Sequence, residues 1–190
     1  MVYIFCWVSE PTDIIWACQM TEKNLSKESD KSFYCVFCKN GFEKNVETFL
    51  RNNGYKIIPS IVERNIVKNR KFIQESRPLI SGYVFFEYED TPNWIEIRKF
   101  EHILYPLAYY DNTKQLRNND KKFVQWLVQN NGIIKISKAI KNGNKIKVME
   151  GPLKDYEKKI VKINKRQKCA KIKIDEEGII NYIWLSYEHI

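Results

Sequence analysis

Two cysteines, Cys35 and Cys38, have the CxxC spacing that zinc sites and thiol redox motifs use. The residues around them, Phe33 to Cys38, form a short apolar run that predicts a buried strand. Residues i and i+3 of a strand point to opposite faces, and no second pair has a matching spacing. We therefore expect neither a metal site nor a redox site at this pair.

Other residues that could support catalysis are few. His102 and His189 are the only histidines, and the chain contains no glycine-rich phosphate loop and no serine, histidine and acid motif. We expect no enzymatic activity, no catalytic residue and no cofactor. The five cysteines form an odd set without an export signal before them, which predicts a reduced, cytoplasmic protein with no membrane span.

Positive charge is the stronger indication of function. The 32 lysines and arginines exceed the acids by nine, and residues 132–190 hold 14 of them against seven acids. A basic excess attracts phosphate backbones, so nucleic acid is the leading partner class. The alternative is that a lysine-rich, isoleucine-rich composition leaves some lysines as solvated surface only.

The basic residues concentrate on an expected hairpin near the C-terminus. Asn164 to Lys168 carries three cations between two expected strands, and Lys171 follows on the second strand. Such a loop could straddle an RNA backbone, or its lysines could only protect a sheet edge from unwanted pairing. We expect a small all-β, SH3-like barrel over residues 145–190, in which Gly151-Pro152 makes a tight reversal. Its expected strands are Lys145 to Met149, Lys159 to Ile163, Cys169 to Ile174 and Ile179 to Leu185.

The preceding hundred residues, 32–131, alternate between strand and helix patterns. They predict an α+β sandwich, an antiparallel sheet with flanking helices, with a charged hairpin around Asn69-Arg70 and a last helix from Asn119 to Asn130. Residues 132–144 are expected to form a linker, and residues 1–31 an N-terminal extension without fixed structure.

The run Tyr83-Val84-Phe85-Phe86 is apolar on both faces of its expected strand. One set of side chains can fill the core under the helices. The other set, Tyr83 with Phe85, must be covered by further elements of the protein or remain exposed as a patch for a partner. Composition alone favours coverage by the protein itself.

Three segments resemble the NusG family of transcription elongation factors. Ser32 to Gly41 and Leu79 to Phe86 resemble strands of its NGN domain, and Gly143 to Tyr156 resembles its KOW motif. The resemblance implies an NGN-like domain followed by a KOW barrel. It also implies that exposed aromatic positions grip the clamp helices of the RNA polymerase β′ subunit, and the matching residues are Phe37, Ile80, Tyr83 and Phe85. The usual proline of this motif is absent, because the segment reads Ile80-Ser81-Gly82-Tyr83.

Within this family the chain resembles the LoaP paralogues of Gram-positive bacteria, through Asn131 to Ser137, Gly151 to Lys154 and the Lys-Arg-x-Lys-x-Ala run. This implies processive antitermination on particular operons and recognition of nascent or leader RNA. The residues assigned to RNA contact are Lys154, Lys165, Arg166, Lys168 and Lys171. Lys39 matches a position near upstream or non-template DNA in some paralogues, and Arg51 lies on the polar side of the helix that follows it. The glycine expected after the KOW turn is Lys158.

Two alternatives remain from the sequence. The chain could be a general NusG-type elongation factor, whose barrel could also contact a ribosomal protein or a termination factor. It could instead be a ribosome-associated KOW protein that binds RNA and never contacts polymerase. In each case we expect a monomer that does not associate with membranes.

Overall fold

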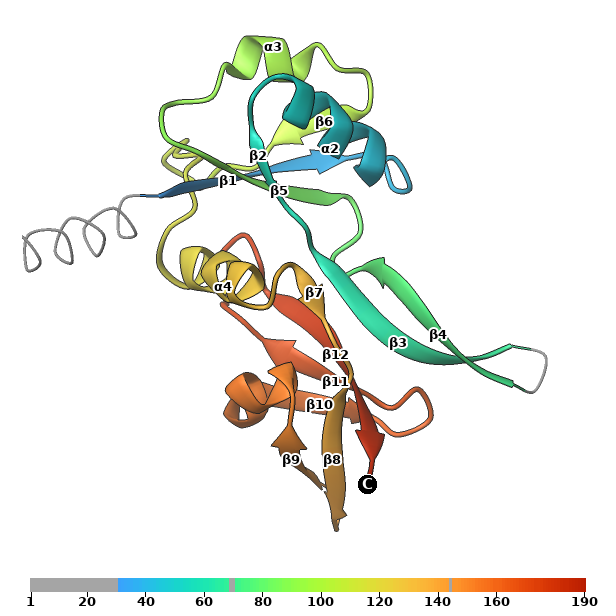
Figure 1. Ribbon diagram of the computed structural model, residues 1–190. Coiled ribbons are helices and arrows are strands. Elements are labelled where there is room, and N and C mark those ends of the chain that lie inside the picture. The colour runs from blue at the N-terminus through green and yellow to red at the C-terminus, as the bar shows by residue number, and fades with distance from the viewer. Residues whose placement is uncertain (1–30, 69–70, 144) are drawn as a thin grey trace, which may run out of the picture. The chain divides into compact units, whose positions relative to one another are not determined.

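A four-stranded antiparallel sheet forms the centre of the N-terminal half in the computed structural model, which describes residues 31–68, 71–143 and 145–190 (Figure 1). Residues 32–190 form one compact unit, and the expected extension lies outside the described residues except for Lys31. The strands follow the order β2-β5-β1-β6. Their bounds are β1 Ser32–Cys38, β2 Lys56–Ile58, β5 Tyr83–Tyr88 and β6 Ile103–Pro106.

Helices cover both faces of this sheet. Helices α2 (Glu43–Asn52) and α3 (Trp94–Arg98) lie over the face that carries Val36 and Phe86. Helix α4 (Asn118–Gln129) lies over the face that carries Cys35 and Phe85. The apolar character of both sets of strand residues therefore follows from two separate cores, one beneath each helical layer. Among the described residues, no helix is long and apolar enough to cross a membrane.

A long hairpin extends from the N-terminal half, as the sequence predicted. Its strands are β3 (Ile61–Lys68) and β4 (Lys71–Pro78), and the short strand β7 (Ile133–Ile134) pairs parallel to the base of β3. In this small sheet Ile61 of β3 lies directly opposite Ile133 of β7. Residues 69–70 at the expected tip lie outside the described residues.

The C-terminal half is a five-stranded sheet in the order β10-β11-β12-β8-β9 (Figure 1). Strand β11 alternates as predicted, with Ala170 and Ile172 buried and Lys171 half-buried between them. The bounds are β8 Ser137–Asn142, β9 Lys145–Glu150, β10 Ile160–Asn164, β11 Cys169–Lys173 and β12 Tyr182–His189. The prediction of an α+β half followed by an all-β half is confirmed.

Two local expectations differ from the structure. Most of the expected linker, residues 132–144, is built into the sheets, because β7 pairs with β3 and β8 pairs with both β12 and β9. The expected tight reversal at Gly151-Pro152 is instead the start of a 3-10 helix, η1 (Pro152–Lys159). Gly151 has a φ of 99°, and a Cβ at this position would lie 2.7 Å from Ser137 Oγ. Because η1 absorbs the bend, Lys158 does not need a left-handed backbone.

Candidate functional site

An aromatic cluster occupies the end of β1 and the beginning of β5. Phe37 pairs with Tyr83 across these strands, so both side chains lie on the sheet face that α4 partly covers. The centroids of their rings are 5.5 Å apart in an edge-to-face arrangement. Both residues and the neighbouring Ile80 are half-buried, which leaves part of each side chain open to a partner. Three of the four sequence-predicted polymerase contacts are therefore brought together at the surface.

Phe85 requires a correction. It has no exposed surface, because it packs against Phe123 of α4 with ring centroids 6.1 Å apart. A direct contact between Phe85 and a partner would need α4 to move. In the structure Phe85 lies beside Tyr83 on the same face of β5, with their ring centroids 6.4 Å apart. Phe85 is therefore covered by the protein itself, as composition favours, whereas Tyr83 remains partly exposed.

A glycine and a buried carboxylate fix the approach of the chain to β5. Gly82 has a φ of 79°, and a Cβ there would lie 2.7 Å from the ring of Phe37. Its N–H donates to the carboxylate of Glu43 at 2.8 Å, and its carbonyl accepts from the N–H of Cys38 at 2.8 Å. These contacts hold Tyr83 against Phe37 without the proline that the family motif usually has. Glu43 is a positioning residue that the sequence did not reveal.

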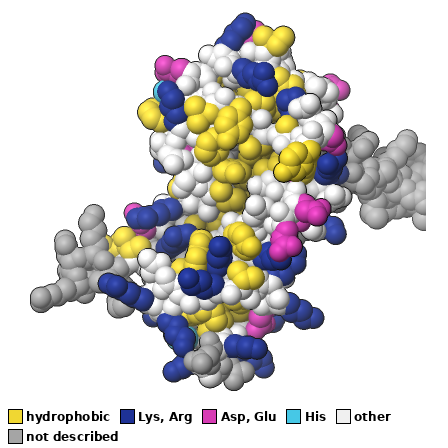
Figure 2. All heavy atoms as spheres, turned by 180° about the vertical axis from the view of Figure 1, so that it is seen from behind, with side chains coloured by type: hydrophobic (Ala, Val, Ile, Leu, Met, Phe, Trp, Pro, Cys, Tyr) yellow, Lys and Arg dark blue, Asp and Glu magenta, His cyan; other side chains and the backbone are white. Residues whose placement is uncertain are grey.

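Tyr105 on β6 is a further member of the cluster that the sequence did not reveal. Its ring centroid lies 5.3 Å from that of Phe37, and 50% of its surface is exposed. Its neighbour Leu104 is exposed as well, because the pairing of β1 with β6 shifts register between Phe37 and Cys38. We call Phe37, Ile80, Tyr83 and Tyr105 the aromatic patch. Figure 2 shows hydrophobic side chains gathered on one side of the N-terminal half.

The basic residues predicted to contact RNA are not all together. Lys165, Arg166 and Lys168 occupy the turn between β10 and β11, where Asn164 Nδ2 donates to the Gln167 side chain at 3.0 Å. Lys171 follows on β11, with its ammonium 3.9 Å from the centroid of the Tyr182 ring. Lys154 belongs to η1 instead, and its Nζ donates to the carbonyl of Met149 at 3.3 Å. A surface rich in Lys and Arg is visible over the C-terminal half in Figure 2.

The two residues assigned to DNA contact lie at the opposite ends of helix α2. Lys39 directly follows β1, and its N–H donates to the carbonyl of His102 at 3.0 Å. Arg51 is in the last turn of α2, and both side chains are exposed. Helix α2 packs on the face of the sheet opposite to α4.

The two cysteines of the CxxC sequence point into different cores, as the strand geometry predicts. Cys35 packs beneath α4 and Cys38 beneath α2. Burial raises the pKa of the Cys38 thiol to about 11 and raises the pKa of Cys35 well above its ordinary value. Both thiols are therefore neutral near pH 7, which disfavours thiolate chemistry. Among the described residues, no group of three His, Cys, Asp or Glu side chains could hold a metal ion.

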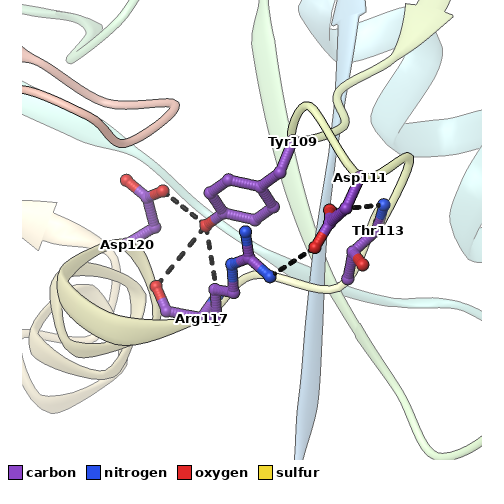
Figure 3. A network of polar contacts seen from close by, with 5 residues as sticks. All are labelled: Tyr109, Asp111, Thr113, Arg117 and Asp120. Carbon is purple, nitrogen blue, oxygen red and sulfur yellow. Dashed lines mark hydrogen bonds and ion pairs between the residues drawn. The ribbon is translucent and has the colours of Figure 1, made fainter.

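Helix α4 connects the N-terminal half to the C-terminal sheet through a buried carboxylate. Asp120 accepts hydrogen bonds from the N–H groups of Ile179 and Ile180 at 2.9 and 3.1 Å. Tyr109 donates its hydroxyl proton to the same carboxylate at 2.5 Å (Figure 3). Burial raises the pKa of Tyr109, and the hydrogen bond to Asp120 raises it further. The carboxylate thus joins the loop before α4 to the loop between β11 and β12.

Arg117 completes this network on its exposed side. Its guanidinium lies 4.3 Å from the centroid of the Tyr109 ring and pairs with Asp111 at 2.7 Å (Figure 3). A second bond between the halves comes from Trp126, whose Nε1 donates to Asp155 of η1 at 2.9 Å. The ring of Trp126 also meets the ring of Tyr156 edge to face. Phe123 of α4 therefore packs against Phe85, the neighbour of Tyr83, while other positions of the helix hold the C-terminal half.

Comparison with known proteins accounts for the N-terminal half. A comparison with curated proteins finds no significant match. Among solved structures, the one described as "Domain interaction in Thermotoga maritima NusG" is 18% identical and aligns with a TM-score of 0.45, covering 82% of this chain and 93% of that one. A family model, "Transcription termination factor nusG", matches residues 31–125, which is half of the chain and includes the sheet, α2, α3 and the start of α4. On the strength of that match, the chain belongs to the NusG family of transcription factors.

Proposed function

We propose that this protein is a transcription elongation regulator that binds the clamp helices of the RNA polymerase β′ subunit through the aromatic patch. The observation that carries the proposal is the half-exposed cluster of Phe37, Tyr83 and Tyr105 in a chain of the NusG family. Exposed groups of large apolar residues are typical of partner-binding surfaces. The residues in direct contact would be those of the patch, while Phe85 lies in the core beside Tyr83.

An aromatic patch of this kind suits a helical partner. Aromatic side chains gain binding energy from burial and bind without large losses of conformational entropy, because each has only two side-chain torsions. The apolar face of a helix can pack into such a surface through residues spaced three and four apart. No ionic contact is required of the patch, so its affinity should depend little on salt.

The protein would act without turnover. A ligand stabilises whichever conformation it binds better, so a factor that bridges the closed clamp favours the elongating state of polymerase. The resulting activity is processive antitermination, and we assign it to particular operons on the resemblance of the C-terminal half to LoaP. In this proposal residues 32–131 are the polymerase-binding domain and residues 145–190 the KOW domain, to which β8 also contributes.

RNA contact is the second part of the proposal. The turn at residues 165–168 and the neighbouring Lys171 present a concentration of positive charge on the C-terminal half. Nascent or leader RNA would supply the phosphates, and DNA near Lys39 and Arg51 would be a separate contact. Attachment of the factor to both polymerase and its transcript would raise the effective concentration of each interaction.

The test is transcription by purified elongation complexes of the organism's own RNA polymerase through an intrinsic terminator. We expect the wild-type protein to increase the fraction of full-length transcript, and the Phe37→Ala/Tyr105→Ala variant to lose that increase. The matched control is Tyr110→Ala, a fully exposed tyrosine outside the patch. If the double variant is folded and equally active, the patch is not the site of action. If the wild-type protein binds ribosomes in high salt and leaves transcription unchanged, the ribosome-associated alternative holds.

A further inference from the structure

A groove lies where the β3–β4 hairpin meets the turn between β10 and β11. Its volume is about 540 Å³, and the residues that line it come from both halves of the chain. The N-terminal half contributes residues of β3 and β4, and the C-terminal half contributes the end of the basic turn and the start of β11. The lining residues are Arg64, Asn65, Ile66, Arg77, Arg166, Gln167, Lys168 and Cys169.

Four of these eight residues are cations, and none is an acid. The cations are Arg64 and Arg77 from the hairpin and Arg166 and Lys168 from the turn. Like charges that approach one another across a concave surface repel, and they reinforce the positive potential within it. An anion bound between them relieves that repulsion.

Arg64 contributes a buried hydrogen-bond donor to this groove in addition to its charge. Its Nε is buried and has no hydrogen-bond partner among the described residues. A buried donor without an acceptor is costly, and such groups call for a physical explanation. The guanidinium also lies close enough to Cys169 to oppose the rise in pKa that burial causes in that thiol. Arg64 therefore points from the hairpin towards the C-terminal sheet.

Arg77 is only partly neutralised. Its Nε pairs with Glu75 at 2.5 Å, and 54% of its side chain is exposed. A guanidinium has five N–H donors, so one ion pair leaves others for a further acceptor. Asn65 and Gln167 add amide groups to the same lining. This combination of guanidinium and amide donors is typical of sites that contact phosphate oxygens.

We propose that the groove binds the phosphodiester backbone of a single-stranded nucleic acid, with Arg64 and Arg77 contributing as much as the basic turn does. This inference extends the RNA contact of the proposed function from the C-terminal half onto the hairpin. The volume is sufficient for one or two nucleotides, and the flanking hairpins would track the strand on either side. The contacts are to phosphate, so they hold the strand without selecting its sequence.

The experiment measures binding of a fluorescent oligouridylate across a series of salt concentrations, with oligothymidylate of equal length in a second arm. The variant Arg77→Gln/Arg166→Gln removes one cation from each half. Its matched control, Arg98→Gln/Lys147→Gln, removes one exposed cation from each half outside the groove. The slope of log affinity against log salt is negative, and for single strands each phosphate contact adds about 0.7 to its magnitude. We expect the groove variant to reduce the magnitude of that slope by about 1.4. We also expect it to weaken the affinity on the order of tenfold at 0.15 M salt.

Single variants test whether the site is composite. Arg77→Gln and Arg166→Gln should each reduce the magnitude of the slope by about 0.7, and Glu75→Gln should strengthen binding by removing the anion beside Arg77. Equal losses in both arms, or a larger loss with RNA, support the proposal. It is overturned if the control variant weakens binding as much as the groove variant, if Arg77→Gln has no effect, or if neither oligonucleotide binds the wild-type protein. Thermal unfolding confirms that each variant is folded.

The outcome is separable from the polymerase interaction. The groove variant should bind the clamp-helix fragment as the wild-type protein does, because neither Arg77 nor Arg166 belongs to the aromatic patch. Loss of oligonucleotide binding with intact fragment binding supports the groove. Failure of the wild-type protein to bind the fragment would contradict the proposed function and leave the result for the groove unaffected.

Discussion

The aromatic patch and the cationic groove differ in the physics that each offers a partner. The patch joins three strands of one sheet and presents partly exposed rings, of which Tyr105 is the most open. The groove is formed by two hairpins from different halves and presents four cations without a lining acid. Binding to the first should depend on apolar burial, and binding to the second on release of counterions. One molecule could therefore hold a protein and a polynucleotide whose affinities respond differently to salt.

The two regions also depend differently on the rest of the molecule. The patch needs the N-terminal sheet and Phe85, whose ring packs against Phe123 of α4. The groove exists only while the C-terminal half keeps its place beside the hairpin, which the bonds of Asp120 and Trp126 support. Substitutions in α4 should consequently change binding at the groove and binding at the patch to different extents.

The largest effect is expected from Phe85→Ala, which removes the buried ring beside Tyr83. Deleting a fully buried aromatic side chain leaves a cavity and lowers the free energy of unfolding by about 3–5 kcal/mol. Urea unfolding measures this change, and Tyr110→Ala, which removes an exposed ring, should stay within about 0.5 kcal/mol of wild type. A loss below about 1 kcal/mol for Phe85→Ala would mean that the residue is a surface contact after all.

Asp120→Ala should have the next largest effect, and it should weaken binding at the groove more than binding at the patch. Two N–H groups, those of Ile179 and Ile180, would lose a charged acceptor, and the free energy of unfolding should fall by about 2–3 kcal/mol. The control is Asp111→Ala, which removes an exposed ion pair with Arg117 and should change the free energy of unfolding less. Oligouridylate affinity should decline more than affinity for the clamp-helix fragment. An equal decline in both would show that α4 does not separate the regions.

Tyr105→Ala tests the patch at its most exposed member. We expect an approximately tenfold loss of affinity for the clamp-helix fragment, equivalent to about 1.4 kcal/mol, with little change in stability. Isothermal titration gives the affinity and thermal unfolding the stability. The control, Ile95→Ala on α3, removes another exposed apolar side chain and should leave the affinity unchanged. A larger effect of Ile95→Ala would mean that the binding surface lies at α3 and not at the aromatic patch.

The smallest effect distinguishes residues within the basic surface. Arg166→Gln should reduce the magnitude of the salt slope of oligouridylate binding by about 0.7, whereas Lys154→Gln should leave it unchanged. The reason is position, because Arg166 lines the groove and Lys154 lies on η1 beside Met149. Fluorescence anisotropy between about 50 and 200 mM salt resolves slopes of this size. Equal changes for the two variants would favour a diffuse basic surface over a defined groove.

The N-terminal sheet was predictable from its strands. Apolar residues on both faces of Tyr83–Tyr88 require cover on both sides, and the helical patterns before and after that strand supply it. The opposite orientations of Cys35 and Cys38 followed from the same alternation. Coverage of Phe85 was favoured by composition, but the family pattern, which groups it with Tyr83, favoured exposure.

Features that depend on pairing between distant segments were not predictable in the same way. Tyr105 joins the patch because β6 pairs with β1 and Tyr105 lies opposite Phe37, and no local pattern specifies that partner. The groove requires Arg64 and Arg166, about a hundred positions apart in the chain, to line one cavity. Strand β8 did carry a local signal, because the sequence Asn142-Gly143-Asn144 is rich in residues typical of hairpin turns. The prediction of a linker over residues 132–144 does not use this signal.

The most direct test of the central claim is a calorimetric titration of the protein with the isolated clamp-helix fragment of β′, at two salt concentrations and two temperatures. We expect binding with a negative heat-capacity change and little dependence on salt. The affinity should be weakened in Tyr105→Ala and unchanged in Arg77→Gln/Arg166→Gln. Absence of binding by the folded protein, or binding that salt abolishes and the groove variant loses, would contradict the central claim.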